Sequence, residues 1–255
     1  MSSTIWTPVE LLSNAEPIGG RAWRAVEAQH QVSTAKLTDN SSEQERLEQI
    51  IEATKPLIPI DCQHLNFLLS TPFRYGSPYP SGSRFRRAGL TLGVFYASEL
   101  ARTAIIEIAF WRLLFFAESP QTPWPRNPGE YTAFAVEFAT ERGIDLTLAP
   151  FEKDRDVWRH PIQYDPCQLL ADGARTAGIE IIKYESARTV SRATNVALLA
   201  CRVFTKSEEV DRQTWRIHLS ATGVRIFCEM PKTNFDLLVS DFGSDPRIQN
   251  MNWNR

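Results

Sequence analysis

The spacing of hydrophobic and polar positions along the chain predicts a mixture of helices and strands. Residues 42–55 have helical spacing, with Leu47, Ile50 and Ile51 on one apolar face, and residues 98–117 form a longer apolar run of the same period. Short helices are also indicated near both of these segments and in the second half of the chain. In chain order, the predicted helices begin at Pro8, Ser42, His64, Ser98 and Asp165.

Capping residues indicate where these helices begin and end. Thr7 precedes a proline in the first helical position, and Ser42 and Glu45 have the spacing of a capping box. Ser98 is the predicted cap of the longest helix. Gly178 is expected to end the helix that begins at Asp165-Pro166.

Alternating or continuous apolar runs predict the strands. In chain order they cover residues 21–29, 92–97, 131–138, 179–184, 196–204, 214–219 and 224–229. The last two are expected to form a hairpin across residues 220–223. No repeat or long linker divides the chain, so the pattern predicts one α+β domain over residues 1–255, with a core at about 60–230 and a helical N-terminal elaboration over 1–59.

Composition restricts the class of protein. The chain has 255 residues, 43% of them hydrophobic, and a formal net charge of -2. This balance lacks the basic footprint of a nucleic-acid-binding domain. No run approaches the roughly 18 apolar residues of a membrane span, and the first twenty residues lack the basic start and apolar run of a signal peptide. A cytoplasmic protein with no membrane association is therefore expected.

The cysteines give little sign of a metal site. Cys62, Cys167, Cys201 and Cys228 form no Cys-x-x-Cys pair and are expected to be reduced, mostly buried thiols. Cys62 and His64 have the proximity of half a zinc site, but no second half follows. We therefore expect no metal.

Two features of the sequence are candidates for a functional site: an arginine-rich loop and a carboxylate on the apolar face of a helix. Residues 71–89 combine arginines with glycines, prolines and aromatic residues, and a guanidinium can bind a diphosphate or simply remain solvated. In the helix 98–117, the 100° rotation per residue groups Ser98, Arg102 and Arg112 on the solvent face and places Glu107 opposite them. A buried carboxylate is costly unless it is paired, so Glu107 is expected either to form a structural salt bridge or to serve a function.

Two segments resemble the RES-domain family, which is named for its arginine, glutamate and serine. The first segment comprises Gly82-Ser83-Arg84-Phe85, Gly89, Gly93, Phe95-Tyr96-Ala97 and Thr103-Ala104-Ile105-Ile106-Glu107, with Phe73-Arg74-Tyr75 upstream. The second comprises Lys183-Tyr184-Glu185-Ser186-Ala187-Arg188 and Asn195. At Glu185 the chain departs from the family, in which proline is common.

The resemblance implies a fold similar to ADP-ribosyltransferases, with split mixed or antiparallel sheets and flanking helices. It also implies cleavage of the nicotinamide–ribose bond of NAD⁺, which is the substrate. The catalytic residues carried over are Glu107, Arg84 and Ser186. The NAD⁺-binding residues carried over are Arg74, Tyr75, Arg84, Tyr96, Ser186 and Asn195.

The resemblance further implies the toxin of a type II toxin–antitoxin pair, with a small Xre/ParS-like antitoxin that occludes the active site. The branch with the Phe73-Arg74-Tyr75 segment favours transfer of ADP-ribose to a protein acceptor, of which phosphoribosyl pyrophosphate synthetase is one in the family. The alternative is an NAD⁺ glycohydrolase or phosphorylase that depletes NAD⁺. A more distant alternative is a non-catalytic module that binds single-stranded nucleic acid through residues 71–89, which the net charge and Glu107 disfavour. Direct nucleic-acid binding is therefore not expected.

Overall fold

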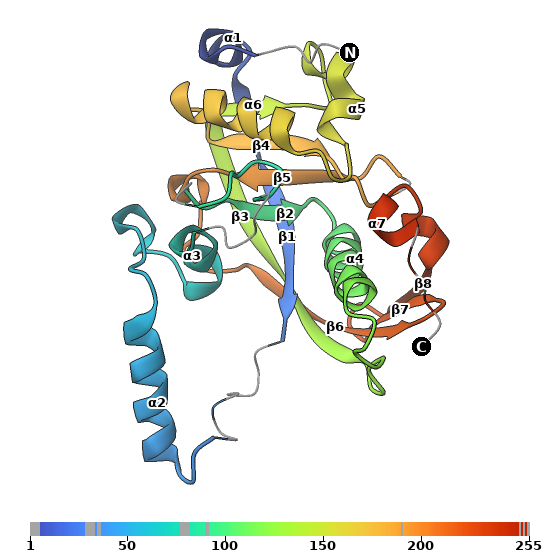
Figure 1. Ribbon diagram of the computed structural model, residues 1–255. Coiled ribbons are helices and arrows are strands. Elements are labelled where there is room, and N and C mark those ends of the chain that lie inside the picture. Colours follow the sequence, from blue (N-terminus) through green and yellow to red (C-terminus); the bar gives the residue numbers. More distant parts are fainter. Residues whose placement is uncertain are drawn as a thin grey trace.

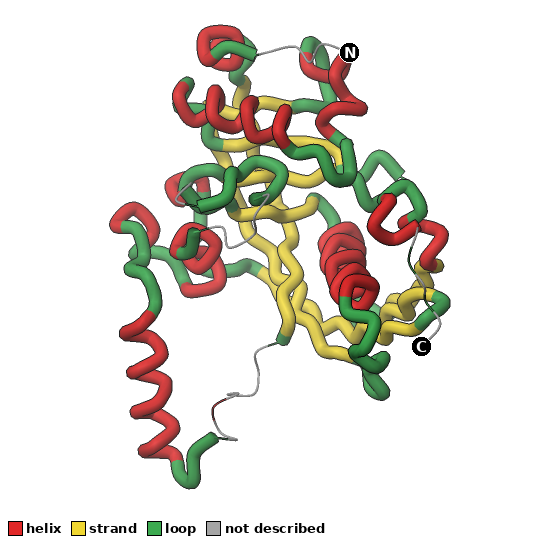
Figure 2. Tube along the Cα trace, in the orientation of Figure 1, coloured by secondary structure: helices red, strands yellow, loops and turns green. Residues whose placement is uncertain are grey.

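The computed structural model of the chain describes residues 6–28, 34, 37–76, 82–89, 92–189, 191–249, 251 and 253. The helices are α1 (Pro8–Ser13), α2 (Ser41–Thr54), α3 (Phe67–Arg74), α4 (Ala101–Glu118), α5 (Arg155–Trp158), α6 (Asp165–Thr176) and α7 (Pro246–Gln249). The strands are β1 (Glu16–Glu27), β2 (Phe95–Ser98), β3 (Gly129–Asp145), β4 (Ile181–Glu185), β5 (Thr194–Leu198), β6 (Asp211–Ser220), β7 (Gly223–Cys228) and β8 (Thr233–Leu238). Strands run through the middle of the molecule and helices surround them (Figure 2).

The long strand β3 joins two portions of one sheet. Along one edge it pairs antiparallel with β1, from Glu27↔Tyr131 to Glu16↔Gly143. Along the other edge it pairs first with β6 and then, in parallel, with β4. The order β1-β2-β5-β4-β3 returns to β1 and closes a ring, while β6, β7 and β8 extend from β3 as an antiparallel arm. The α+β class is confirmed, and the expected split of the sheet takes the form of two portions that share β3.

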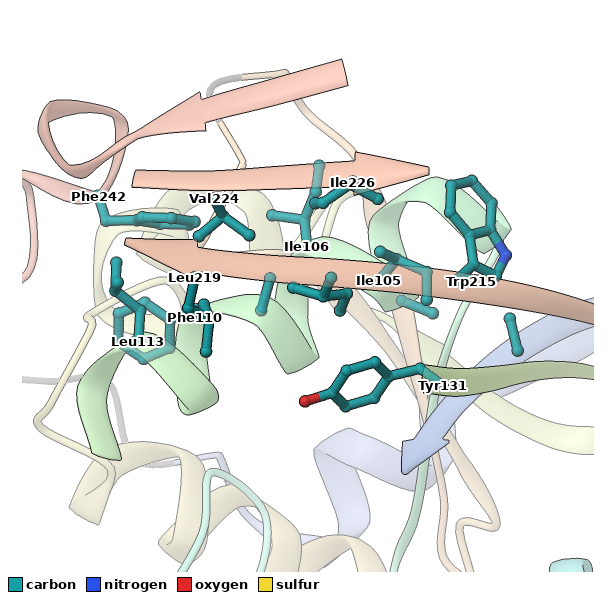
Figure 3. Close-up of a cluster of buried hydrophobic side chains, with 14 of the residues drawn as sticks. Ile105, Ile106, Phe110, Leu113, Tyr131, Trp215, Leu219, Val224, Ile226 and Phe242 are labelled. Atoms are coloured by element: carbon teal, nitrogen blue, oxygen red, sulfur yellow. The ribbon is translucent and has the colours of Figure 1, made fainter. Parts of the chain in front are cut away.

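Helices cover different parts of this sheet. In Figure 1, α5 and α6 lie beside β4 and β5, and α4 lies against β6 and β7. The α4 side of the core contains Ile105, Ile106 and Phe110, which pack against strand residues that include Leu219 and Ile226 (Figure 3). Because α4 is anchored along its length by these contacts, the side chains on its remaining face have fixed positions.

The first two helices differ in how closely they follow the sequence pattern. Thr7 and Glu10 form the capping box of α1, which confirms the predicted start. In α2 the predicted cap is wrong, because Asn40 rather than Ser42 accepts the hydrogen bond, from the backbone of Glu43. Asn40 and Glu43 have the same three-residue spacing as the predicted pair, and asparagine is an equally good cap.

The predicted apolar face of α2 is not buried in the core, since Leu47 and Ile51 are only half-buried. No residue of α2 is buried, and Ile50 is 51% exposed. The helix stands away from the sheet in Figure 1, so periodicity alone predicted its existence but not its packing.

Ser98 does not cap α4, which is a correction to the predicted helix start. The cap residue is Leu100, without a side-chain hydrogen bond. Ser98 is buried at the end of β2, opposite Asn195 of β5, so strand pairing removes it from the solvent face. Arg102 is exposed as expected, and Arg112 is half-buried.

Other observed helix and strand boundaries differ from the predicted ones, because contacts with residues distant in sequence determine them. Residues 71–74, predicted as loop, form the last turn of α3, and the strand predicted to reach residue 204 ends at Leu198. β1 begins at Glu16, five residues before the predicted start of this strand. Two predicted parts lie outside the described residues, namely residue 29 of this strand and residues 77–81 of the loop. The hairpin between β6 and β7 and the end of α6 before Gly178 (φ +72°) are confirmed.

Two of the four cysteines are paired, contrary to the expectation of reduced thiols. Cys62 and Cys201 form a disulfide with their Cα atoms 5.4 Å apart, because two short turns bring these residues together. Cys167 and Cys228 are free and buried. Within the described ranges, no group of three or more His, Cys, Asp or Glu side chains is placed to hold a metal. No helix there is long and apolar enough to cross a membrane.

Candidate active site

The carboxylate of Glu107 is held by two neutral hydrogen-bond donors. Its Oε1 accepts a hydrogen bond from Ser186 Oγ at 2.7 Å and another from Asn195 Nδ2 at 2.8 Å. Ser186 and Asn195 are buried, whereas Glu107 is only half-buried. Neither partner neutralises the charge of Glu107, so the site contains a fixed negative charge that remains partly accessible.

Strand register orients the amide of Asn195. Asn195 on β5 lies between Ser98 of β2 and Tyr184 of β4. Ser98 Oγ donates to Asn195 Oδ1 at 2.7 Å, which leaves the amide nitrogen to face Glu107. The sheet therefore determines which end of the amide meets the carboxylate.

The hydroxyl of Ser186 is oriented in a similar way. Ser186 follows the end of β4, and its Oγ accepts a hydrogen bond from the backbone nitrogen of Arg188 at 3.0 Å. Because this contact uses Ser186 Oγ as an acceptor, its proton is directed to Glu107. In this arrangement Ser186 positions the carboxylate and is not set up as a nucleophile.

Arg84 is buried in a tight turn among backbone carbonyls. Its guanidinium donates to the carbonyls of Trp158 and His160, the latter at 3.1 Å, and lies 5.0 Å from the centre of the Tyr164 ring. Gly82 opens the turn with φ +67°, and a Cβ there would lie 2.2 Å from a backbone oxygen, so the turn requires glycine. No carboxylate in the described part of the chain forms an ion pair with Arg84.

Tyr96 supports the turn that carries Arg84. Its hydroxyl lies 2.8 Å from Ser83 Oγ and accepts a hydrogen bond from the backbone nitrogen of Phe85 at 3.0 Å. Burial raises the pKa of the Tyr96 hydroxyl, and its two hydrogen bonds oppose this shift without cancelling it. The hydroxyl is thus neutral at physiological pH and contacts Ser83 and Phe85, the two residues that flank Arg84 in the sequence.

Arg188 and Tyr184 belong to this neighbourhood but were not among the predicted site residues. The guanidinium of Arg188 lies 3.8 Å from the centre of the Phe110 ring and pairs with Asp245 at 2.6 Å. Burial lowers the pKa of Arg188, and the charge of Glu107 opposes that shift. Burial likewise raises the pKa of Tyr184 well above its usual value, and Glu107 adds to the effect.

One feature of the sequence pointed to Arg188 as a residue of this site: it lies two residues after Ser186, in the second segment that resembles the family. A single arginine after a strand is usually solvated, and its partner Asp245 lies in a segment without a motif. The pair could therefore not be identified before the fold was known.

Arg74 and Tyr75 lie apart from the Glu107 group. Arg74 ends α3, pairs with Glu52 of α2 at 2.6 Å and donates to the carbonyl of Pro56. Tyr75 is 38% exposed, and its carbonyl accepts a hydrogen bond from Arg86. The structure thus brings together Glu107, Ser186 and Asn195. Tyr96 of β2 contacts the turn that carries Arg84, and Arg74 is paired with Glu52 of α2.

Comparisons with known proteins find a matching family model and a similar solved structure. Residues 58–220 match the family model described as RES domain, a range that includes Arg84, Glu107 and Ser186. No curated protein matches the chain. A chain of the crystal structure of the M. tuberculosis MbcT–MbcA toxin–antitoxin complex is similar, with a TM-score of 0.44 and 10% identity, over 91% of this chain and 92% of that chain.

Proposed function

The chain belongs to the RES domain family, and from the geometry around Glu107 we propose that it is an enzyme that breaks the nicotinamide–ribose bond of NAD⁺. The observation that carries this proposal is the carboxylate of Glu107, held by Ser186 and Asn195 with no ion-pair partner among the residues the structure describes. We further propose that the enzyme is the toxin of a toxin–antitoxin pair, with a small Xre/ParS-like antitoxin that covers this site.

A fixed carboxylate suits the chemistry of this bond. When the bond between ribose C1′ and the nicotinamide nitrogen breaks, its electron pair leaves with nicotinamide, which becomes neutral and needs no proton. The ribose develops positive charge, which a preorganised negative group stabilises. Glu107 supplies that charge, and its Oε2, which accepts no hydrogen bond from the described residues, is available to a ribose hydroxyl.

Arg84 and Tyr96 supply the binding groups in this proposal. A guanidinium that contacts carbonyls rather than a carboxylate keeps its full positive charge, which suits the diphosphate of NAD⁺. Tyr96 holds the turn of Arg84 through its hydroxyl, and in this proposal its ring contacts nicotinamide. Ser186 and Asn195 act through Glu107. Arg74 receives no role, because Glu52 already neutralises it.

The test is NAD⁺ consumption by the purified protein and by its Glu107→Gln variant. Glutamine keeps an oxygen that can accept hydrogen bonds from Ser186 and Asn195, so the fold is retained while the charge is removed. We expect turnover to fall by roughly 100-fold, the size of a lost electrostatic contact in a transition state. Glu118→Gln, at the exposed end of the same helix, is the matched control and should turn over NAD⁺ normally. A folded Glu107→Gln variant that matches the wild-type rate contradicts the assignment.

The acceptor of ADP-ribose is a separate part of the proposal. We favour a protein acceptor, of which phosphoribosyl pyrophosphate synthetase is one candidate. Incubation of NAD⁺ labelled in its adenosine part with a cell extract should then label a discrete protein band. Release of free ADP-ribose or its phosphate without a labelled band would instead indicate a glycohydrolase or phosphorylase. Tight, salt-dependent binding to an oligonucleotide without NAD⁺ turnover would favour a nucleic-acid-binding module.

A further inference from the structure

A hollow of about 160 Å³ lies between β1 and α3, outside the Glu107 site. Its walls are largely apolar and include Val26, Leu68 and Pro72. Arg24 of β1 and Thr71 of α3 also line it. Apolar walls with a few convergent polar groups are the usual composition of a small-molecule site.

The guanidinium of Arg24 is the unusual member of this lining. Its Nη1 donates to the carbonyl of Tyr96 at 2.9 Å, and the group lies 5.1 Å from the centre of the Phe95 ring. Neither contact carries a formal negative charge. Across the described ranges, Arg24 forms no ion pair, and most of its five N–H donors remain unused.

The other charged groups that line the hollow already have partners. Arg212 pairs with Glu209, and Glu27 pairs with Arg112. Arg24 is therefore the lining cation whose charge is not compensated. Its burial without a counter-ion also lowers the pKa of Arg24, to about 10, which agrees with this assignment.

The lining selects among anions. A guanidinium fork matches the two oxygens of a carboxylate. A doubly charged phosphate would lose more hydration free energy against Val26, Leu68 and Pro72 than a singly charged carboxylate. Glu27 at the same hollow would also repel the double charge more strongly than the single one. The volume limits the rest of the ligand to a short apolar group, well below the size of a nucleotide.

We propose that this hollow binds a small apolar carboxylate, with its carboxylate on Arg24 and its alkyl group against Val26, Leu68 and Pro72. This site is additional to the proposed NAD⁺ site and does not depend on it. The two are nevertheless linked, because Arg24 binds the carbonyl of Tyr96, whose hydroxyl holds the turn of Arg84.

The test uses 3-methylbutanoate and its neutral isostere 3-methylbutanamide, titrated into the full-length protein and followed by calorimetry or by NMR chemical shifts. The two probes share shape and differ in charge. We expect saturable binding of the carboxylate, at least about tenfold tighter than binding of the amide. Arg24→Gln should lose this preference, whereas Arg216→Gln, an exposed arginine of β6, should retain it. Glu107→Gln should also bind the carboxylate normally, which separates this site from the proposed NAD⁺ site.

Because Arg24 supports the backbone at Tyr96, Arg24→Gln could fail to fold, so a second variant tests the site without changing Arg24. Thr71→Phe fills the hollow from the exposed surface of α3 and leaves Arg24 in place. It should lose carboxylate binding by a similar factor while its thermal unfolding remains cooperative. Equal binding of the two probes, wild-type binding by Thr71→Phe, or tighter binding of inorganic phosphate than of 3-methylbutanoate would each overturn the proposal.

Discussion

The candidate site depends on which polar atoms of single residues are already engaged. Asn195 can present its amide nitrogen to Glu107 because Ser98 occupies its oxygen, and Ser186 can donate because the backbone of Arg188 occupies its oxygen as an acceptor. Tyr96 similarly uses its hydroxyl on the two sides of Arg84. Each of these residues therefore acts by holding another: Ser186 and Asn195 hold Glu107, and Tyr96 holds the turn of Arg84. In the proposed function, Glu107 and Arg84 are the groups assigned to the substrate.

The role of the Tyr96 hydroxyl gives a prediction at this scale. Tyr96→Phe keeps the ring but removes the contacts with Ser83 and Phe85, so the turn that carries Arg84 should loosen. We expect the KM for NAD⁺ to rise about tenfold, with a smaller change in kcat, and stability to fall by roughly 1 kcal/mol.

The matched control is Tyr131→Phe, which removes a buried hydroxyl that accepts from Arg112 outside the site. It should lose comparable stability without a change in KM. If both variants keep the wild-type KM for NAD⁺, Tyr96 does not position Arg84.

At the scale of elements, α7 reaches back to the site although it lies outside the family match. Asp245, directly before α7, pairs with Arg188, and both side chains are almost completely buried. Burial alone would raise the pKa of Asp245, but hydrogen bonds from Arg247 and the charge of Arg188 outweigh it and lower the pKa below its usual value. The C-terminal segment is thus connected to Ser186 through a buried ion pair.

The Asp245 pair gives a prediction that depends on pH. Asp245→Asn leaves the charge of Arg188 buried without its partner, which should cost roughly 3–5 kcal/mol of unfolding free energy at pH 7. Because the folded-state pKa of Asp245 is lowered, its contribution is fully present above about pH 4, the pKa of an aspartate in an unfolded chain, and is lost as pH falls below that value.

Denaturant unfolding of wild type and variant from pH 7 to pH 3 measures this difference. It should be largest at neutral pH and should shrink towards pH 3, whereas Asp236→Asn on the exposed face of β8 should show little difference at either end. A difference that stays constant across this range would show that the charge of Asp245 is not responsible.

The same elements show what a sequence can and cannot predict. The starts of α1 and α6 depend on a nearby cap or proline, so local pattern was sufficient. Glu107 was identified because one polar residue on an apolar helix face is a local anomaly. Ser98 was wrongly predicted as a helix cap because strand pairing determines its role. Asp245 was missed because its role depends on a contact with Arg188, 57 residues earlier in the sequence. Such contacts depend on topology, which hydrophobic periodicity does not specify.

At the scale of the whole molecule, the bond between Cys62 and Cys201 connects the segment before α3 to the turn after β5. It spans 139 residues of sequence, and a closed loop of that length restricts the unfolded chain. Removing the bond is therefore expected to lower the unfolding free energy by up to about 5 kcal/mol.

Thiol counting and denaturant unfolding test this bond. In denaturant without reductant, the purified protein should titrate as two thiols, from Cys167 and Cys228, and with reductant its unfolding midpoint should fall. The double variant Cys62→Ala with Cys201→Ala should have the lower midpoint under both conditions. Four thiols in the absence of reductant would contradict the pairing.

The ring in the sheet has a consequence for how the chain reaches its folded state. β1 ends at Glu27, and the strand with which it forms most of its pairs, β3, begins only at Gly129. The closing contact is therefore strongly non-local, and its loop entropy must be overcome before its hydrogen bonds form. On the ribosome, β1 emerges early, and its pairs with β3 cannot form until about 100 further residues have been made. A strand edge exposed for that long is a site for misassembly with other chains, which makes the time before β3 emerges the vulnerable period in the synthesis of this protein.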